Sequence, residues 1–204
     1  DNEPFKTMIV RAAISDDCST LAEIHLNSFY DFFLSSLGKR FLITFYKACI
    51  KSKGAINVVC STNDGVTIGF ALASIKSDGF YRNILFGNLF AFTMEAVRLL
   101  FSRPKALLRL ALNLSKSGSD VGDEAELLSI ASLPEYSGKG VGKLLIDTIE
   151  SRLKDRQCKA ITLTTDYYDN DKVIGFYLSR GFEIEGEFVT YPGRRMYRMI
   201  KYLD

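Results

Sequence analysis

Tryptophan is absent from these 204 residues, histidine occurs once, and proline occurs four times. The single imidazole, His25, excludes catalytic or metal sites that need several histidines. The four cysteines, Cys18, Cys49, Cys60 and Cys158, lack the close pairs that bind zinc or build a disulfide framework. We therefore expect free thiols, no metal site and a cytoplasmic location.

Long hydrophobic runs and a strong charge of one sign are also lacking. The most apolar stretch, residues 84–101, is interrupted by Asn88, Glu95 and Arg98, which argues against a transmembrane segment. The formal net charge of +2 is too small for a general nucleic-acid-binding protein, so we expect no nucleic-acid partner. With 47% hydrophobic residues, the chain can build a sizeable core, and we expect one domain over residues 1–204.

The hydrophobic pattern predicts strands and helices that alternate along most of the chain. Strands are predicted over residues 8–13, 56–61, 66–73, 126–132, 160–165, 182–190 and 195–202. Helices are predicted over residues 15–29, between Gly38 and Gly54, and over 140–157 and 172–179. These elements indicate an α/β (α+β) fold with a mixed sheet of about seven strands.

Residues 79–117 differ from the rest, because they are rich in Leu and Phe and lack the alternation of a strand. We expect two or three helices here, inserted between the third and fourth strands. Arg103-Pro104 marks a break, and Pro104 is expected as a first helical residue. The insertion is also basic, with Arg82, Arg98, Arg103, Lys105, Arg109 and Lys116 set against Glu95.

Several roles are compatible with this basic, apolar insertion. It can cover the acceptor site and receive an acidic acceptor through its Arg and Lys side chains. Its apolar faces can form a homodimer, or it can make peripheral contact with an anionic membrane surface. It can also serve simply as additional core with a solvated basic rim.

A predicted strand is followed by a turn with three glycines, Gly138, Gly140 and Gly142, and the turn opens a predicted helix. Glycines let the backbone approach a ligand closely, and a helix start presents unpaired N–H groups and a positive dipole end. The combination predicts an anion site suited to a pyrophosphate. Lys139 and Lys143 add positive charge beside it.

Two common phosphate-binding motifs do not fit this turn. A Walker A loop has four residues between its first glycine and its Gly-Lys pair, whereas three residues separate Gly138 from Gly142, and Leu144 replaces the expected hydroxyl. The dinucleotide-binding turn of Rossmann folds needs a third glycine where Leu145 stands.

The turn instead resembles the coenzyme A loop of Gcn5-related N-acetyltransferases (GNAT), Arg/Gln-x-x-Gly-x-Gly/Ala. Here that frame is Ser137-Gly138-Lys139-Gly140-Val141-Gly142, with Ser137 in place of Arg or Gln. A second segment, from Asn170 to Phe182, resembles the family's Asn-x-x-Ala-x-x-Phe/Leu-Tyr-x-x-x-Gly-Phe pattern, with Val173 in place of Ala. Both matches stand in the family's order and spacing, and the resemblance covers nearly the whole chain except residues 79–117.

The resemblance implies a GNAT fold, in which the sheet is splayed between its fourth and fifth strands, and acetyl-CoA as co-substrate. Pantetheine would lie in that gap, along the strand ending at Ser132, where backbone N–H groups would also face the thioester oxygen. The residues expected to contact the cofactor are Ile130, Ser132, Leu133, Ser137, Gly138, Lys139, Gly140, Val141, Gly142, Lys143, Asn170 and Tyr177.

Two residues are expected to carry the catalysis. Tyr177 occupies the position of the family's general acid, which would protonate or hydrogen-bond the leaving thiolate. Glu126, at the start of the central strand, is the first candidate for the base that deprotonates the incoming amine. Glu124 and Asp166 are alternatives, and His25 is a further one.

The predicted activity is transfer of an acetyl group from acetyl-CoA to a primary amine by direct attack. A small, acidic acceptor such as an amino sugar nucleotide fits the basic insertion. A protein or peptide N-acetyltransferase is an alternative, and so is a non-catalytic domain that senses acyl-CoA.

Overall fold

The computed structural model describes residues 7–116, 124–190 and 193–204. Its strands are β1 Met8–Ala12, β2 Ala55–Thr62, β3 Thr67–Ser74, β4 Ala125–Ser132, β5 Ala160–Asp166, β6 Glu183–Thr190 and β7 Arg194–Tyr202. Its helices are α1 Cys18–Ser28, α2 Phe33–Ser36, α3 Lys39–Lys51, α4 Phe80–Gly87, α5 Leu89–Ser102, α6 Pro104–Lys116, α7 Val141–Asp155 and α8 Asp171–Ser179, with short 3-10 turns η1 Ser15–Asp17 and η2 Pro134–Tyr136.

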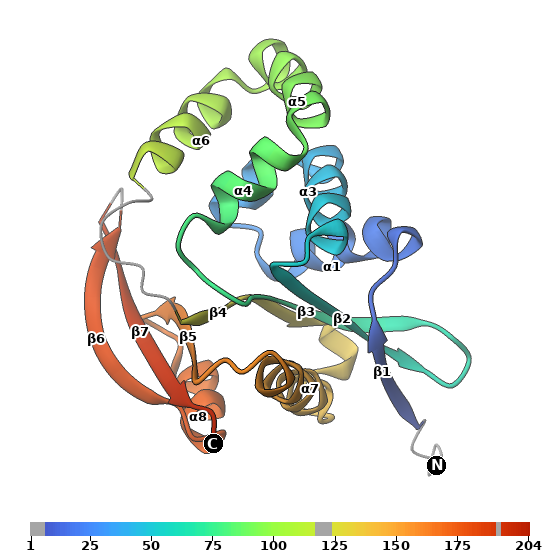
Figure 1. The fold of residues 1–204 in the computed structure, drawn as a ribbon, viewed down its shortest axis with the longest axis vertical. Helices are drawn as coiled ribbons and strands as arrows, with labels where there is room; N and C mark the ends of the chain where they lie inside the picture. The colour runs from blue at the N-terminus through green and yellow to red at the C-terminus, as the bar shows by residue number, and fades with distance from the viewer. Residues whose placement is uncertain (1–6, 117–123, 191–192) are drawn as a thin grey trace.

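The strands form one sheet with the order β1-β2-β3-β4-β5-β7-β6, and helices flank it (Figure 1). Every neighbouring pair is antiparallel except β4 and β5, which run parallel. The predicted mixed, seven-stranded α+β fold is therefore confirmed. A parallel pair needs a crossover, and α7 supplies it between β4 and β5.

The two faces of the sheet are covered by different helices (Figure 1). On one face α1 and α3 pack through buried residues such as Leu21, Leu42 and Phe45. On the other face lies α7, and the residues Val141, Leu145, Ile149 and Leu153 of its buried stripe are at most 1% exposed. These residues recur every four positions, so the stripe stays on one side of the helix.

The insertion forms α4, α5 and α6, which lie on the side of α1 and α3. The break predicted at Arg103-Pro104 is confirmed, and Pro104 begins α6. The short helix α2 was missed, because Phe33–Ser36 is only one turn and carries no periodic signal. Within the described residues no single helix is long and apolar enough to cross a bilayer, although α4 and α5 together have that composition across a 94° bend.

Glu95 fastens the insertion to the rest of the fold. It lies on α5, is 4% exposed, and accepts hydrogen bonds from Arg40 Nε of α3 at 3.1 Å and Arg98 Nε at 2.9 Å. A buried carboxylate needs such partners, since burying it unpaired is costly. The one acidic residue of the insertion therefore sets where α5 lies against α3.

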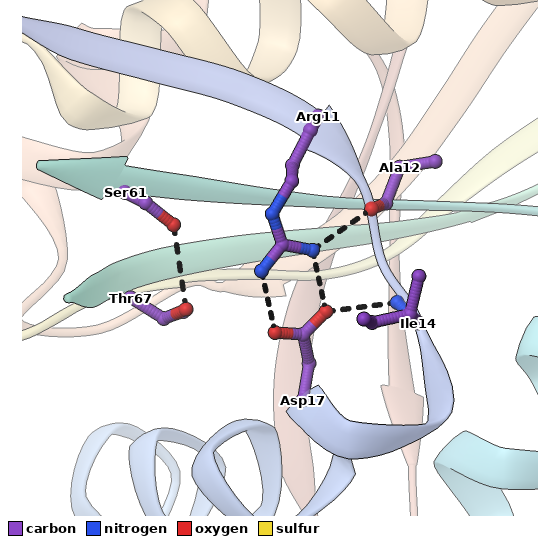
Figure 2. A network of polar contacts seen from close by, with 6 residues as sticks. All are labelled: Arg11, Ala12, Ile14, Asp17, Ser61 and Thr67. Carbon is purple, nitrogen blue, oxygen red and sulfur yellow. Dashed lines mark hydrogen bonds and ion pairs between the residues drawn. The ribbon is translucent and has the colours of Figure 1, made fainter. Parts of the chain in front are cut away.

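A second ion pair, shown in Figure 2, joins β1 to the turn that follows it. Arg11 of β1 donates two hydrogen bonds to the Asp17 carboxylate, at 2.7 and 2.8 Å, and Ile14 N–H donates a third at 2.8 Å. Although burial alone would raise the pKa of Asp17, these contacts with Arg11 and Ile14 lower it. The turn between β1 and α1 is thereby held in place.

Candidate active site

The central feature of the site is the point where β4 parts from β5. These strands pair only over Ala125↔Ile161, Glu126↔Thr162 and Leu127↔Leu163. By contrast, β4 stays paired with β3 as far as Ser132↔Gly69, with a register shift after Leu72. The β5-facing edge of β4 is therefore unpaired by β5 beyond Leu127, where the resemblance places the splay.

The orientation of the β4 amides follows from its pairing with β3. Leu133 N–H donates to Ile68 O at 2.8 Å. Because antiparallel residues alternate in direction, the N–H groups of Ser132 and Ile130 point away from β3, toward the open edge. Ile130 and Ser132, two of the three cofactor-contact residues predicted on this segment, thus direct their N–H groups toward the open edge. The N–H group of the third, Leu133, is hydrogen-bonded to β3.

The glycine turn has the backbone that its residues require. Gly138 and Gly140 have φ of 76° and 89°, in the left-handed region that L-residues with a Cβ avoid. A Cβ added at either position would meet nothing within 4 Å, so the surface above the turn is open. Gly140 is the N-cap residue of α7, and the first N–H groups of that 15-residue helix face the same turn.

The other two positions of the turn serve packing. The side chain of Val141 is 1% exposed in the core under α7, so only its backbone can face a ligand. A Cβ on Gly142 would lie 3.3 Å from the Phe176 ring, which brings α8 against the first turn of α7. A glycine that was not predicted, Gly69 of β3, has no room at all, because its Cβ would lie 2.7 Å from Val141 Cγ1 and 2.8 Å from Ala131 O.

The polar side chains around the turn are exposed. Ser137 N–H donates to Pro134 O at 3.0 Å, closing η2 before the turn. The Lys139 ammonium lies 5.4 Å from the centre of the Tyr136 ring. Lys143 Nζ lies 3.0 Å from Asp147, and such an exposed pair is weak enough for Lys143 to turn toward an anion.

Asn170 lies at the N-cap position of α8, but its side chain makes no capping bond. Its Nδ2 donates instead to Thr165 Oγ1 at 2.7 Å and to Asp166 O at 3.0 Å. Asn170 is thus the N-cap residue of α8 by position, without a capping bond from its side chain. Its amide is spent on fixing the start of α8 to the end of β5.

Tyr177 lies on α8, within the core cluster that contains Val141 and Leu127. Its side chain is 6% exposed, and its ring meets Phe182 edge-on with centroids 5.6 Å apart. Burial raises the pKa of Tyr177. A phenol in this position keeps its proton, so it is suited to donate a hydrogen bond.

Glu126 lies on β4 directly before the parting point. Burial raises the pKa of this carboxyl, and the positive charge of Arg198 on β7 offsets only part of the effect. Glu126 also lines a cavity together with Tyr81 of α4. Burial and the charge of Glu126 raise the pKa of Tyr81. A half-buried carboxyl with a raised pKa is suited to accept a proton.

The alternative bases are placed less favourably. Asp166, at the end of β5, accepts two hydrogen bonds from Arg194, which bind its charge in an ion pair. Glu124 precedes β4, and its carbonyl accepts a hydrogen bond from Ser77 N–H at 3.0 Å. Neither is among the described residues that line the cavity beside Glu126.

His25, the further candidate base, is packed in the interior. It is 3% exposed, its Nδ1 lies 2.7 Å from Tyr46 Oη, and burial lowers its pKa to about 4. Tyr46 also hydrogen-bonds Ser129 of β4. This chain from α1 through α3 to β4 was not predicted, because its members are far apart in sequence and each is an ordinary core or strand residue.

The cavity beside Glu126 has a volume of about 670 Å³ and lies beneath the insertion. Helices α4, α5 and α6 supply most of its walls, including Phe80, Phe92, Leu99 and Leu107. The sequence predicted helices here but gave no sign of a cavity. Most of its walls come from the faces of three helices, α4, α5 and α6, which meet only in the folded chain.

Three of the insertion's basic side chains make contacts away from the cavity. Arg98 pairs with Glu95, Arg103 Nη1 donates to Ser36 O at 2.7 Å, and Arg109 lies 5.2 Å from the centre of the Phe33 ring. Arg82 is the described basic residue that lines the cavity. Contacts with α2 and α5 thus engage Arg98, Arg103 and Arg109, and of the basic residues named above Arg82 is the one left to support the acidic-acceptor role of the insertion.

Acetyl-CoA fits the residues that are present. The open turn at Gly138 and Gly140 and the start of α7 offer N–H groups to a pyrophosphate. The free-facing amides of Ile130 and Ser132 offer an extended chain the hydrogen bonds of an added strand. Within the described ranges no group of three His, Cys, Asp or Glu residues is placed to hold a metal ion.

Sequence comparison supports the same assignment. Residues 20–182 match the model of the acetyltransferase (GNAT) family. A curated relative, the uncharacterized protein YdhI of Bacillus subtilis (strain 168), is 34% identical over 67 residues, which are 33% of this chain and 40% of YdhI. The chain thus matches well under half of that relative's length.

Several solved structures share the fold. Ard1 from Thermoplasma volcanium has a TM-score of 0.63 at 16% identity and covers 97% of this chain and 98% of its own. YncA from Salmonella typhimurium, a putative acetyltransferase solved with its cofactor acetyl-CoA, has a TM-score of 0.63 at 17% identity, covering 97% and 94%. The ribosomal-protein-S18-alanine N-acetyltransferase from Escherichia coli has a TM-score of 0.58 at 16% identity, covering 97% and 95%. With its splayed sheet, its glycine turn and a family match over residues 20–182, the chain belongs to the GNAT family of acetyltransferases.

Proposed function

We propose that this protein transfers an acetyl group from acetyl-CoA to a primary amine. The observation that carries the proposal is the parting of β4 from β5 after Leu127, next to Glu126. The open strand edge can bind the donor, and the cavity on the insertion side can bind the acceptor. Two substrates held at one point convert a bimolecular encounter into an oriented reaction.

In this mechanism the acceptor nitrogen bonds to the acetyl carbon as the C–S bond breaks. The amine enters as an ammonium ion, gives one proton to the Glu126 carboxylate, whose raised pKa favours proton acceptance, and attacks as the neutral amine. The second proton passes from the nitrogen to the departing thiolate, which becomes the free thiol of CoA. Tyr177 O–H donates a hydrogen bond to the departing sulfur, because burial keeps the phenol protonated. The amide of Ser132 or Ile130 stabilises the charge that develops on the thioester oxygen.

The identity of the acceptor has more than one candidate. Arg82, on the cavity wall, supports an acidic small molecule such as an amino sugar nucleotide. A protein or peptide amine is a second candidate, which the exposed position of the lining residue Phe86 supports. The homodimer and membrane contacts stay predictions, for which the exposed Phe90 and Phe101 of α5 offer an apolar surface.

The test measures free thiol released from acetyl-CoA across a panel of amines, together with calorimetry of CoA binding. We expect micromolar-range binding and amine-dependent thiol release. Binding without turnover of any amine would favour the acyl-CoA sensor. No binding at millimolar CoA would contradict both.

A further inference from the structure

We propose that the cavity beneath the insertion binds a hydrocarbon group of the acceptor, so that the substrate is an amphipathic primary amine with its nitrogen at Glu126. The inference rests on the proposed N-acetyl transfer, which assigns Glu126 as the base. It goes further by naming the chemical class of the acceptor. The size of the cavity, its lining and the exposure of two apolar lining side chains support it.

The walls of the cavity are mainly aliphatic and aromatic. Nine of its lining side chains are Phe41, Phe80, Leu85, Phe86, Leu89, Phe92, Leu99, Leu107 and Leu110. A volume of about 670 Å³ is in the usual range for small-molecule sites. A sugar or nucleotide here would leave hydroxyl groups against carbon, and unpaired polar groups are costly to bury.

The polar groups of the cavity gather at its β4 end. Ser77 is held beside β4, because its N–H donates a hydrogen bond to Glu124 O. Tyr81 lies close enough to Glu126 for the charge of the carboxylate to raise the pKa of the phenol, in addition to the effect of burial. Thr93, on the far wall, donates its hydroxyl to Leu89 O at 2.8 Å and so is satisfied within its own helix. Arg82 of α4 also lines the cavity, with an exposed side chain. Apart from Arg82 and Thr93, the described lining has a polar end at β4 and an apolar body, the complement of an alkyl or arylalkyl amine.

Two of the apolar lining side chains are largely exposed: Phe86 is 69% exposed and Leu89 is 59% exposed. Exposed hydrophobic side chains around a binding cavity mark it as an interaction site for apolar groups. An acceptor with a hydrocarbon group would cover these side chains when bound.

The acceptor suits this cavity better than a long acyl chain of the donor. The open edge that would hold the donor lies along β4 after Leu127, whereas Glu126 precedes it. A hydrocarbon chain entering the cavity from the donor would bring the Glu126 carboxylate no positive charge beyond that of Arg198. An ammonium group that enters with its alkyl chain pairs with this carboxylate before it gives up its proton.

The test compares ethylamine, butylamine, hexylamine and octylamine, all below micelle-forming concentrations, with acetyl-CoA as donor. We expect kcat/KM to rise about fourfold for each methylene added, until the cavity is full. The matched polar control is 2-(2-aminoethoxy)ethanol, which is close to hexylamine in length but carries two oxygens. Its kcat/KM should stay near that of ethylamine.

Two matched variants locate the effect in the cavity. Ala96 lines the cavity and Ala91 lies exposed on the same helix, outside the described lining. Ala96→Phe should lower kcat/KM for octylamine by tenfold or more and flatten the dependence on chain length. Ala91→Phe should retain the wild-type profile, and calorimetry with CoA should show that both variants are folded.

Each remaining result has a definite meaning. Equal kcat/KM for hexylamine and its polar analogue would overturn the inference and leave N-acetyl transfer intact. A preference for octanoyl-CoA that Ala96→Phe abolishes would assign the cavity to the donor and also overturn it. If no amine is acetylated, the proposed function fails, and octylamine binding by calorimetry then decides: binding that Ala96→Phe weakens supports the apolar amine site, and no binding overturns it.

Discussion

The proposed donor side and the proposed acceptor side of the site are built from different parts of the chain. The donor side consists of backbone: the open edge of β4, the left-handed turn at Gly138 and Gly140, and the start of α7. The acceptor side consists of side chains: Glu126 and the apolar walls supplied by α4–α6. The comparison teaches that a donor common to many relatives can be held by peptide groups, whereas selection of an acceptor needs side chains.

The largest expected effect is on the acceptor side. Glu126→Gln removes the base but keeps the shape of the side chain, and we expect kcat to fall by about 10²–10⁴-fold. Binding of CoA should be unchanged, because the donor contacts are backbone groups. In the wild type, kcat/KM should rise with pH as Glu126 loses its proton, at a pH above 4.5 because burial raises the pKa of Glu126. This rise should disappear in the variant.

Stability gives an independent check on Glu126. A carboxyl with a raised pKa in the folded state costs stability as pH rises through that pKa, so Glu126→Gln should unfold no more easily than wild type at neutral pH. Glu124→Gln is the matched control and should keep activity within about threefold of wild type, well below the loss of a catalytic group. A greater loss in Glu124→Gln than in Glu126→Gln would reverse the assignment and break the comparison.

The next effect concerns the interior next to the acceptor side. Burial lowers the pKa of His25 to about 4, so the folded state favours the neutral ring. The contribution of neutral His25 to the free energy of unfolding is therefore fully present above the ordinary histidine pKa of 6.5. It is lost between pH 6.5 and about 4, by up to about 3 kcal/mol. Urea titrations at pH 7, 5.5 and 4.5 measure it.

A variant separates His25 from the carboxylates. His25→Asn can keep a hydrogen bond to Tyr46 Oη without titrating, so its loss of stability over this pH range should be small. Asp17 acts in a separate pH range. Because its pKa is lowered, its contribution to the free energy of unfolding is lost only below its ordinary pKa of 3.8. An equal slope in His25→Asn and wild type would remove His25 as the cause.

The same contrast explains what could be predicted from sequence. The strands, the glycine turn and α7 were predictable, because period-2 and period-3.6 patterns and positive-φ glycines leave local signals. The chain from His25 through Tyr46 to Ser129 and the cavity walls were not, because they join residues from α1, α3–α6 and β4. Long-range side-chain packing leaves no spacing to detect.

Gly69 shows how closely the donor side is packed. A Cβ at this position would lie 2.7 Å from Val141 Cγ1 and 2.8 Å from Ala131 O, so Gly69→Ala must push β3 away from β4 or α7. We expect the free energy of unfolding to drop by about 1–3 kcal/mol, as in other overpacked cores. Calorimetry should show weaker CoA binding as well, because the end of β4 shifts. The strand control is Gly186→Ala, where a Cβ meets nothing within 4 Å; an equal cost at both would contradict the steric explanation.

The smallest expected effect tests the donor side alone. Gly140 has φ of 89° with open space above it, so Gly140→Ala introduces backbone strain of about 1–2 kcal/mol and no clash. If the turn relaxes to relieve this strain, its N–H groups lose their alignment, and we expect the Kd for CoA to rise about tenfold, the equivalent of 1.4 kcal/mol. The chain-length dependence for alkylamines should persist, since no acceptor contact changes. Gly175→Ala on α8, also in open space but without a positive φ, should bind CoA like wild type. A selective loss of amine discrimination in Gly140→Ala would show that backbone and side-chain parts of the site are not separable.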